Sequence, residues 1–253
     1  MSGVVRDSER VPERRTGNDS ATVRDVIDAR DGCELFTLRT LRAVVGHSIA
    51  RATGEAAELL FVVSGDGTLV TSDGEHRLEP ETGVLLRPDE RYEFVNAGPE
   101  DVCVVSVALH EPQAHPRDAT ALSHLADQAA QSATADRQFR IVFDADNGCP
   151  SATQFVGYIP VGAAPAHYHL YDEVIYVLDG TGVMHMGGEQ TPLRAGSAIS
   201  LPAREVHILA NSGPSVMRVL GVFRPAGSPA EAYYPDGTPA QPAGAPQEAA
   251  VST

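Results

Sequence analysis

The sequence predicts an all-β protein made of two similar barrels in tandem, and three observations support this fold class. Short segments rich in β-branched residues recur along the chain, and most are bounded by Gly, Pro, Asn or Asp. Their turn signals are spaced at roughly 8–12 residues, which is typical of antiparallel sandwiches and barrels. Landmark residues of the first half recur in the second half at a nearly constant separation.

The repeat is visible in residues of the same type. Three pairs are 115 positions apart, namely Glu58 and Glu173, Gly65 and Gly180, and Asn96 and Asn211. Three more pairs are 113 to 116 positions apart, namely Gly83 and Gly196, Pro88 and Pro202, and Cys33 and Cys149. Six landmarks with so constant an offset indicate an internal duplication. Because Cys33 and Cys149 recur at equivalent places, we expect both to be packing residues.

The pattern divides the chain into five parts: a disordered arm at residues 1–27, a first barrel at 28–112, a linker at 113–137, a second barrel at 138–227 and a tail at 228–253. The arm is polar and aperiodic, which favours disorder. The linker contains the single helix-compatible stretch, residues 119–135, so we expect a short helical linker. In the Pro- and Ala-rich tail, the adjacent Tyr233 and Tyr234 are compatible with a surface strap or with a segment that docks onto the body.

Composition limits the class of partner. The formal net charge is −15, from 34 acidic and 19 basic residues, and such a surface repels nucleic acids and anionic membranes. The chain contains no lysine, which excludes a lysine Schiff base and a Walker-type phosphate loop. No stretch has the ~18 apolar residues of a membrane span, and the first residues do not resemble a signal peptide. We therefore expect a cytoplasmic protein whose partner is a small molecule.

Three histidines and a glutamate follow a strand pattern in the second half. Side chains two residues apart on a strand share a face, so His167 and His169 point the same way. Glu173 has the same parity, and His207 ends a later strand-turn-strand unit. Three imidazoles and one carboxylate inside one barrel would suit a divalent transition metal with open coordination positions. A single strand histidine is more often a packing residue, so the prediction depends on the combined spacing.

That combined spacing is His-x-His-x3-Glu-x6-Gly followed by Gly-x5-Pro-x4-His-x3-Asn. It resembles the two motifs of the cupin superfamily, which are carried here by His167, His169, Glu173 and Gly180 and by Gly196, Pro202, His207 and Asn211. The resemblance implies two tandem cupin (jelly-roll) barrels and a metal held by His167, His169, Glu173 and His207. Gly162 and Arg204 depart from the motifs without touching a ligand position.

The first barrel keeps the scaffold without the ligands. Ala52 and Gly54 stand where the second barrel has its paired histidines. Tyr92 or Glu93 falls where His207 would be, and the spacing to Asn96 favours Tyr92. Glu58 alone matches a ligand, and one carboxylate does not hold a transition metal with useful affinity. We expect a bicupin with a metal only in the second barrel, similar to quercetinase-like cupin enzymes, and compatible with assembly into a homodimer.

The resemblance implies one divalent ion per chain, and the ligand types fit Fe(II), Mn(II), Ni(II), Co(II), Cu(II) and Zn(II) alike. By strand parity, Ile175, Val177 and Leu209 continue the inward faces, and we expect them to line a substrate pocket with Tyr158. Ordinary barrel packing accounts for the three apolar residues equally well. No cluster of arginines lies near the motif, which favours an aromatic, enolic or diketone substrate over a highly charged one.

Three functions remain open. The first is an O2-dependent dioxygenase in which Glu173 takes a proton from a metal-bound substrate. The second is a redox-neutral isomerase, cyclase, decarboxylase or lyase in which the metal acts as a Lewis acid. The third is a small-molecule-binding cupin without turnover. The intact ligand set of the second barrel favours an enzyme.

Overall fold

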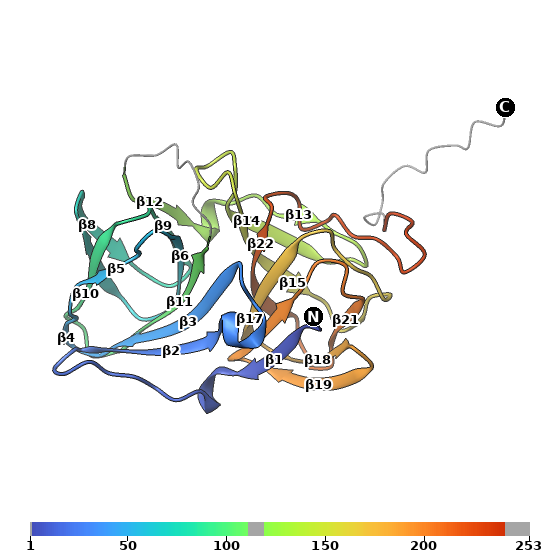
Figure 1. Ribbon diagram of the computed structural model, residues 1–253, viewed down its shortest axis with the longest axis horizontal. Helices are drawn as coiled ribbons and strands as arrows, with labels where there is room; N and C mark the ends of the chain where they lie inside the picture. The colour runs from blue at the N-terminus through green and yellow to red at the C-terminus, as the bar shows by residue number, and fades with distance from the viewer. Residues whose placement is uncertain (1, 111–118, 241–253) are drawn as a thin grey trace.

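Two β-barrels lie side by side along the longest axis of the molecule (Figure 1). The computed structural model describes residues 2–110 and 119–240. Nearly all regular structure in these residues is strand, and the helical segments among them are short 3-10 turns, η1 (Ser8–Arg10), η2 (Ala29–Asp31) and η3 (Leu125–Asp127). The prediction of an all-β protein with two tandem barrels is confirmed.

The first barrel is a sandwich of two antiparallel sheets. Its strands are β2 (Ala21–Ile27), β3 (Phe36–Ala43), β4 (Gly46–His47), β5 (Arg51–Ala52), β6 (Ala57–Ser64), β7 (Gly67–Thr71), β8 (Gly74–Leu78), β9 (Thr82–Leu86), β10 (Arg91–Asn96), β11 (Val102–Leu109) and β12 (Ala121–His124). The larger sheet has the order β12-β9-β6-β11-β3-β2, and the smaller has β4-β10-β7-β8, with β5 also paired to β10. In β10 every second side chain is buried, as the alternation of a half-buried strand requires.

The second barrel repeats this arrangement. Its strands are β1 (Val4–Asp7), β13 (Gln131–Ser132), β14 (Gln138–Phe143), β15 (Thr153–Ile159), β16 (Gly162–Ala163), β17 (Asp172–Asp179), β18 (Thr181–Met186), β19 (Glu189–Arg194), β20 (Ser197–Leu201), β21 (His207–Asn211) and β22 (Met217–Arg224). The larger sheet has the order β1-β20-β17-β22-β15-β14-β13, and the smaller has β16-β21-β18-β19.

Strand pairing confirms the internal duplication at the level of single residues. The series β9-β6-β11-β3 in the first barrel corresponds to β20-β17-β22-β15 in the second. Glu58 of β6 lies opposite Leu86 of β9, and Glu173 of β17 lies opposite Leu201 of β20. The two glutamates therefore occupy the same place in two copies of one scaffold.

An apolar cluster joins the two barrels. Each barrel has an interior core, and a third cluster combines residues of both larger sheets, such as Val107 of β11 and Val222 of β22. Cys33 and Cys149 lie in this shared cluster and are buried. Both cysteines are packing residues, as their recurrence in the sequence led us to expect.

The expectation of a disordered arm at residues 1–27 is wrong for the residues that the structure describes. Strand β1 pairs with β20 of the second barrel from Val4 opposite Ser200 to Asp7 opposite Ser197. Strand β2 then pairs with β3 of the first barrel. The arm is ordered because each strand completes a sheet edge that would otherwise leave backbone groups unpaired.

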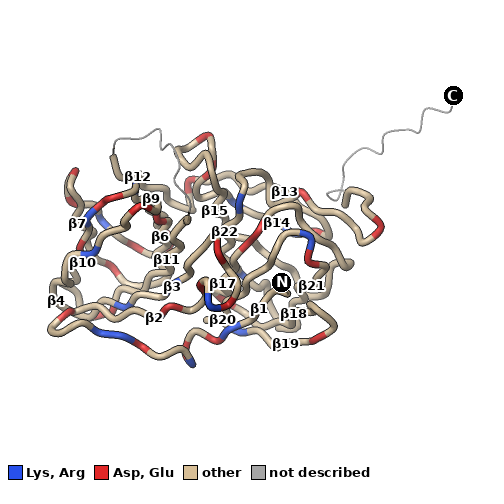
Figure 2. Tube along the Cα trace, in the orientation of Figure 1, with Lys and Arg blue, Asp and Glu red and all other residues tan. Residues whose placement is uncertain are grey.

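Ion pairs accompany the arm. Acidic residues are spread over both barrels, whereas several arginines lie along the arm (Figure 2). Arg194 contacts Asp7 at 2.6 Å, and Arg24 contacts Glu9 at 2.9 Å. Because these pairs are partly exposed, each contributes at most about 1 kcal/mol, and the strand pairing itself provides most of the order.

The predicted helical linker is also wrong. Within 119–135 the chain forms strand β12 on the edge of the first barrel, the turn η3 and strand β13 on the edge of the second barrel. In β12 the small residues Ala121 and Ser123 face the protein, and sheet pairing outweighs the helix propensity of the alanines. Residues 113–118 of the linker and 241–253 of the tail lie outside the described residues.

In the part of the chain that is described, no helix is both long enough and apolar enough to cross a membrane. This agrees with the hydropathy of the sequence.

Removal of residues 1–7 should destabilise the protein. The deletion strips β1 from the sheet and exposes the β20 edge, so we expect a loss of at least about 1 kcal/mol, or a fall of roughly 2–4 °C in Tm, with more aggregation. Thermal unfolding with light scattering measures both effects. Removal of Met1 and Ser2 alone is the control, and an unchanged Tm in the longer deletion would show that β1 contributes nothing.

Candidate metal centre

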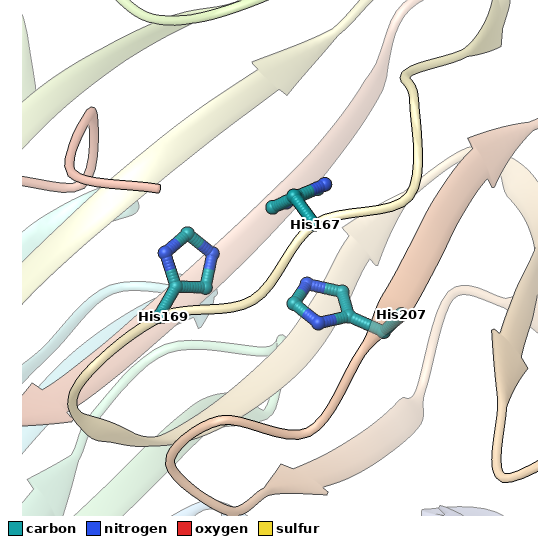
Figure 3. Close-up of side chains that lie close together, drawn as sticks. All are labelled: His167, His169 and His207. Atoms are coloured by element: carbon teal, nitrogen blue, oxygen red, sulfur yellow. The ribbon is translucent and has the colours of Figure 1, made fainter. Parts of the chain in front are cut away.

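Three histidines meet inside the second barrel (Figure 3). His167 and His169 lie between β16 and β17, and His207 is the first residue of β21. The His167 N–H donates to the His207 carbonyl at 3.1 Å, and the His207 N–H donates to the His167 carbonyl at 2.9 Å. This isolated bridge holds the two ring centroids 4.5 Å apart.

The arrangement brings one ring nitrogen of each histidine close to the other two. The ligand nitrogens lie within 4.8 Å of one another, and no other set of three or more His, Cys, Asp or Glu side chains is so placed in residues 2–110 and 119–240. Each Nδ1 donates to a backbone carbonyl: His167 to Pro165 at 2.9 Å, His169 to Glu231 at 2.6 Å, and His207 to Glu205 at 2.9 Å. A carbonyl only accepts, so each Nδ1 carries the proton and each Nε2 is available to a metal.

Aromatic stacking adds a further restraint on His169. The ring of Tyr171 lies parallel to the imidazole at a centroid distance of 4.7 Å and stacks in turn on Phe223 at 3.9 Å. Tyr171 is buried, so the stack is part of the core. His169 is thus held from one side by this stack and from another by the Glu231 carbonyl.

Burial keeps the three imidazoles neutral. Desolvation, with a smaller contribution from neighbouring histidines, lowers the pKa of His169 to about 4 and that of His207 well below its ordinary value. Desolvation also lowers the pKa of His167. Neutral imidazole is the form that binds metal, so the site needs no proton release from its histidines at neutral pH.

Glu173, the fourth predicted ligand, lines the same cavity but is not part of the group within 4.8 Å. It is buried, and desolvation raises its pKa to about 8. Gly221 on the neighbouring strand permits this position, because a Cβ there would lie 3.0 Å from Oε1 of Glu173 and 2.3 Å from the ring of Phe155. The structure therefore brings together the three predicted histidines and sets the glutamate at the cavity wall.

The first barrel fills the corresponding space. The Tyr92 hydroxyl donates to Oε2 of Glu58 at 3.1 Å, and the Ser106 hydroxyl donates to Oε1. Arg39 lies 3.9 Å from the same carboxylate. Tyr92 occupies the position equivalent to His207, as the spacing predicted, and a satisfied hydrogen-bond network stands where the second barrel has its cavity.

The cavity beside the histidines has a volume of about 80 Å³. Of the four residues predicted to line a substrate pocket, Tyr158, Ile175 and Leu209 are in its wall. Val177 is not, because it lies fully buried in the interior core of the barrel with residues such as Ile199 and Met217. Strand parity correctly predicted that the Val177 side chain points into the barrel. It did not predict that this residue lies deeper in the core than the cavity.

Sequence reasoning missed an arginine in the cavity wall. Arg137, at the end of the predicted linker, lines the cavity and donates to the Leu209 carbonyl. Desolvation lowers its pKa to about 10, so it remains charged at neutral pH. The cavity is therefore not purely apolar. No motif signals this residue, because it reaches the site from the β13–β14 hairpin rather than from the motif strands.

The start of the predicted tail crosses the site as a strap, which we define as residues 228–240. Tyr233 pairs by two backbone hydrogen bonds of 2.9 Å with Tyr168, and the two rings stack at 5.6 Å. Pro229 and Ala232 line the cavity. Of the two alternatives for the tyrosine pair, docking onto the body is therefore observed for Tyr233.

Two family models match the chain. The cupin domain model matches residues 154–223, within the second barrel, and the AraC-like ligand binding domain model matches residues 42–145, which include most of the first barrel. A search of curated protein sequences finds no match.

Solved structures share the whole two-barrel arrangement. A putative glyoxylate-induced protein from Pseudomonas aeruginosa has a TM-score of 0.72 at 18% identity, over 87% of this chain and 88% of the other. Ylba from E. coli has 0.73 at 11% identity, over 88% and 90%. An oxalate decarboxylase from Bacillus subtilis, described with Mn(II) centres, has 0.71 at 13% identity, over 90% and 78%.

The fold, the motifs and the two matches make the chain a member of the cupin superfamily. Within that class it is a two-barrel cupin whose histidine cluster, in the described residues, lies in the second barrel.

Replacement of His169 by alanine should abolish metal binding. The change removes one of three convergent nitrogens, so we expect the metal content of the purified protein to fall at least about tenfold. Elemental analysis measures the loss. His185→Ala is the matched control, since His185 belongs to β18 of the same barrel and is outside the cluster. Equal metal content in both variants would contradict the ligand assignment.

Glu173→Gln should change how stability depends on pH in metal-free protein. Between its ordinary pKa of 4.5 and the folded value of about 8, Glu173 ionises only when the chain unfolds, so the wild type loses stability as pH rises through this window. The glutamine variant lacks this loss. We expect its advantage in unfolding free energy to grow by roughly 3–5 kcal/mol between about pH 5 and about pH 8.

Denaturant unfolding at several pH values measures this difference. The histidines titrate in both proteins, so their contributions cancel in the comparison. Glu189→Gln, at an exposed position of β19, is the control. Parallel pH curves for wild type and Glu173→Gln would show that Glu173 is ionised in the folded protein.

Proposed function

We propose that the chain is a divalent-metal-dependent enzyme whose second barrel acts on a small organic substrate. One observation carries the proposal: three buried histidines each bring a ring nitrogen within 4.8 Å of the others, while each Nδ1 is bonded to a backbone carbonyl. A histidine that serves only in packing does not need two neighbouring histidines that carry the proton on the same ring nitrogen. The donor set fits a borderline metal such as Fe(II), Mn(II), Ni(II), Co(II), Cu(II) or Zn(II).

His167, His169 and His207 would hold the ion, and Glu173 would complete or flank its coordination. A bound metal supplies Lewis acidity toward substrate oxygens and, for a redox-active ion, a route to O2 chemistry. The protein would supply ligands held by the backbone and a cavity walled in part by Phe155 and by Pro229 and Ala232 of the strap. The match to an AraC-like ligand binding domain supports small-molecule binding by this fold in general.

Glu173 is the residue we assign to proton transfer. Phe155 and Gly221 border its carboxyl group, and burial raises its pKa to about 8. That value belongs to the metal-free protein. A bound divalent cation would favour the carboxylate form, so in the metal-loaded site Glu173 would act as a base that accepts a proton from the substrate and returns it. The glutamate of the first barrel, by contrast, is bound by Tyr92 and Ser106.

O2-dependent dioxygenation of an enolic, diketone or aromatic compound is the reaction we favour. A redox-neutral reaction such as decarboxylation or isomerisation is the second candidate, favoured by the likeness to an oxalate decarboxylase with Mn(II) centres. Both reactions use the same ligands and the same proton carrier, so the distinction depends on whether O2 is consumed.

The test loads metal-free protein separately with Fe(II), Mn(II), Ni(II) and Zn(II) and follows diketone and enol substrates in an oxygen electrode. We expect substrate loss and O2 consumption to rise together with metal content and to stop in His169→Ala. Turnover under strict anaerobiosis, sustained by Zn(II), would establish the redox-neutral reaction instead. Substrate binding without turnover by any loaded form would leave a binding protein and refute both enzymes.

A further inference from the structure

Arg137 reaches the cavity from a β-hairpin of unusual backbone conformation. Strands β13 and β14 are joined by a turn closed by hydrogen bonds from Ala133 N–H to the Arg137 carbonyl (2.8 Å) and from Arg137 N–H to the Thr134 carbonyl (3.3 Å). Ala135 and Asp136 both have φ of 57°, a left-handed conformation that disfavours residues with a Cβ. The hairpin therefore retains a conformational cost at the two positions that precede the arginine.

The guanidinium is in the cavity wall with the three histidines. It donates to the Leu209 carbonyl, which satisfies only part of a group with five N–H donors. Among the described residues, no carboxylate is paired with it. Two other arginines that are buried or half-buried do have a carboxylate partner: Arg51 pairs with Asp19 at 2.6 Å, and Arg87 pairs with Glu90 at 2.5 Å.

Glu173 is not the counterion of Arg137. It lines the same cavity, yet in the part of the chain that is described no ion pair joins its carboxyl group to Arg137 or to another arginine. A charge held in a poorly hydrated cavity without a partner is unfavourable unless a ligand brings the opposite charge. Guanidinium groups bind carboxylates with two parallel hydrogen bonds, which gives both strength and orientation.

We infer that Arg137 binds a carboxylate of the substrate, so that the second barrel acts on a small organic acid with separate oxygen atoms for the metal. The inference rests on the proposed function and deepens it, because the arginine and the three histidines would hold opposite ends of one molecule. The cavity is small, about 80 Å³, which favours a small acid over a larger one. This revises the expectation, made from the sequence, that the site disfavours a charged substrate.

The test compares two probes that differ in one group. Both 2,4-pentanedione and 2,4-dioxopentanoate carry a 1,3-diketone that can chelate a metal, but the second has a carboxylate in place of one methyl group. Calorimetry measures the binding of each to wild type, Arg137→Met and Arg137→Lys, in Mn(II)-loaded and in chelator-stripped protein. Arg204→Met, at an exposed position of the same barrel, is the matched control.

We expect wild type to prefer 2,4-dioxopentanoate and Arg137→Met to lose affinity for it by roughly 10–100-fold, with little change for 2,4-pentanedione. Arg137→Lys should recover part of the loss, and Arg204→Met should behave as wild type. Equal weakening of both probes, unchanged affinity of 2,4-dioxopentanoate, or its failure to bind either form at millimolar concentration would overturn the inference. Thermal unfolding checks that each variant is folded.

The two forms of the protein separate the two ideas. If no metal binds, loaded and stripped protein will give the same affinities, and the proposed function fails. The preference between the probes, and its dependence on Arg137, is read within each form and decides the inference about the substrate independently.

Discussion

The backbone bridge between His167 and His207 is the interaction on which the candidate metal centre depends. It joins the segment before β17 to the start of β21 and sets the two rings at neighbouring positions. His169 follows two residues later on the same face, and its Nδ1 is held by the strap. Because backbone carbonyls orient all three rings, the geometry of these candidate ligands is set by the main chain and does not require an ion.

Each barrel contains one of two equivalent buried glutamates, and the surroundings of the two residues are opposite in character. In the first barrel Glu58 receives hydrogen bonds from Tyr92 and Ser106, so its space is closed and its charge is satisfied. In the second barrel the residue equivalent to Ser106 is Gly221, and a histidine replaces the tyrosine. A few substitutions on a duplicated scaffold thus separate a filled structural core from a cavity lined by three histidines.

Features with a local signature could be predicted from the sequence. The duplication, the two barrels and the convergence of the three histidines follow from period-two patterning and motif spacing. Features that depend on pairing between strands far apart in the sequence could not be predicted. The four residues of β1 carry too little pattern to reveal a partner strand, and the alanines of the linker favour a helix that sheet edges override. Parity placed Val177 on the correct face, but depth inside the barrel depends on tertiary packing.

Strand β1 has a consequence for biosynthesis. Val4 pairs with Ser200, so strand β1 waits during synthesis for a partner that is translated 196 positions later. The first barrel and its β2 edge can form in the meantime, whereas the larger sheet of the second barrel is completed only after β20 has been made. The N-terminal segment therefore pairs with the second barrel late in folding, and it links the histidine-bearing barrel to the barrel made before it.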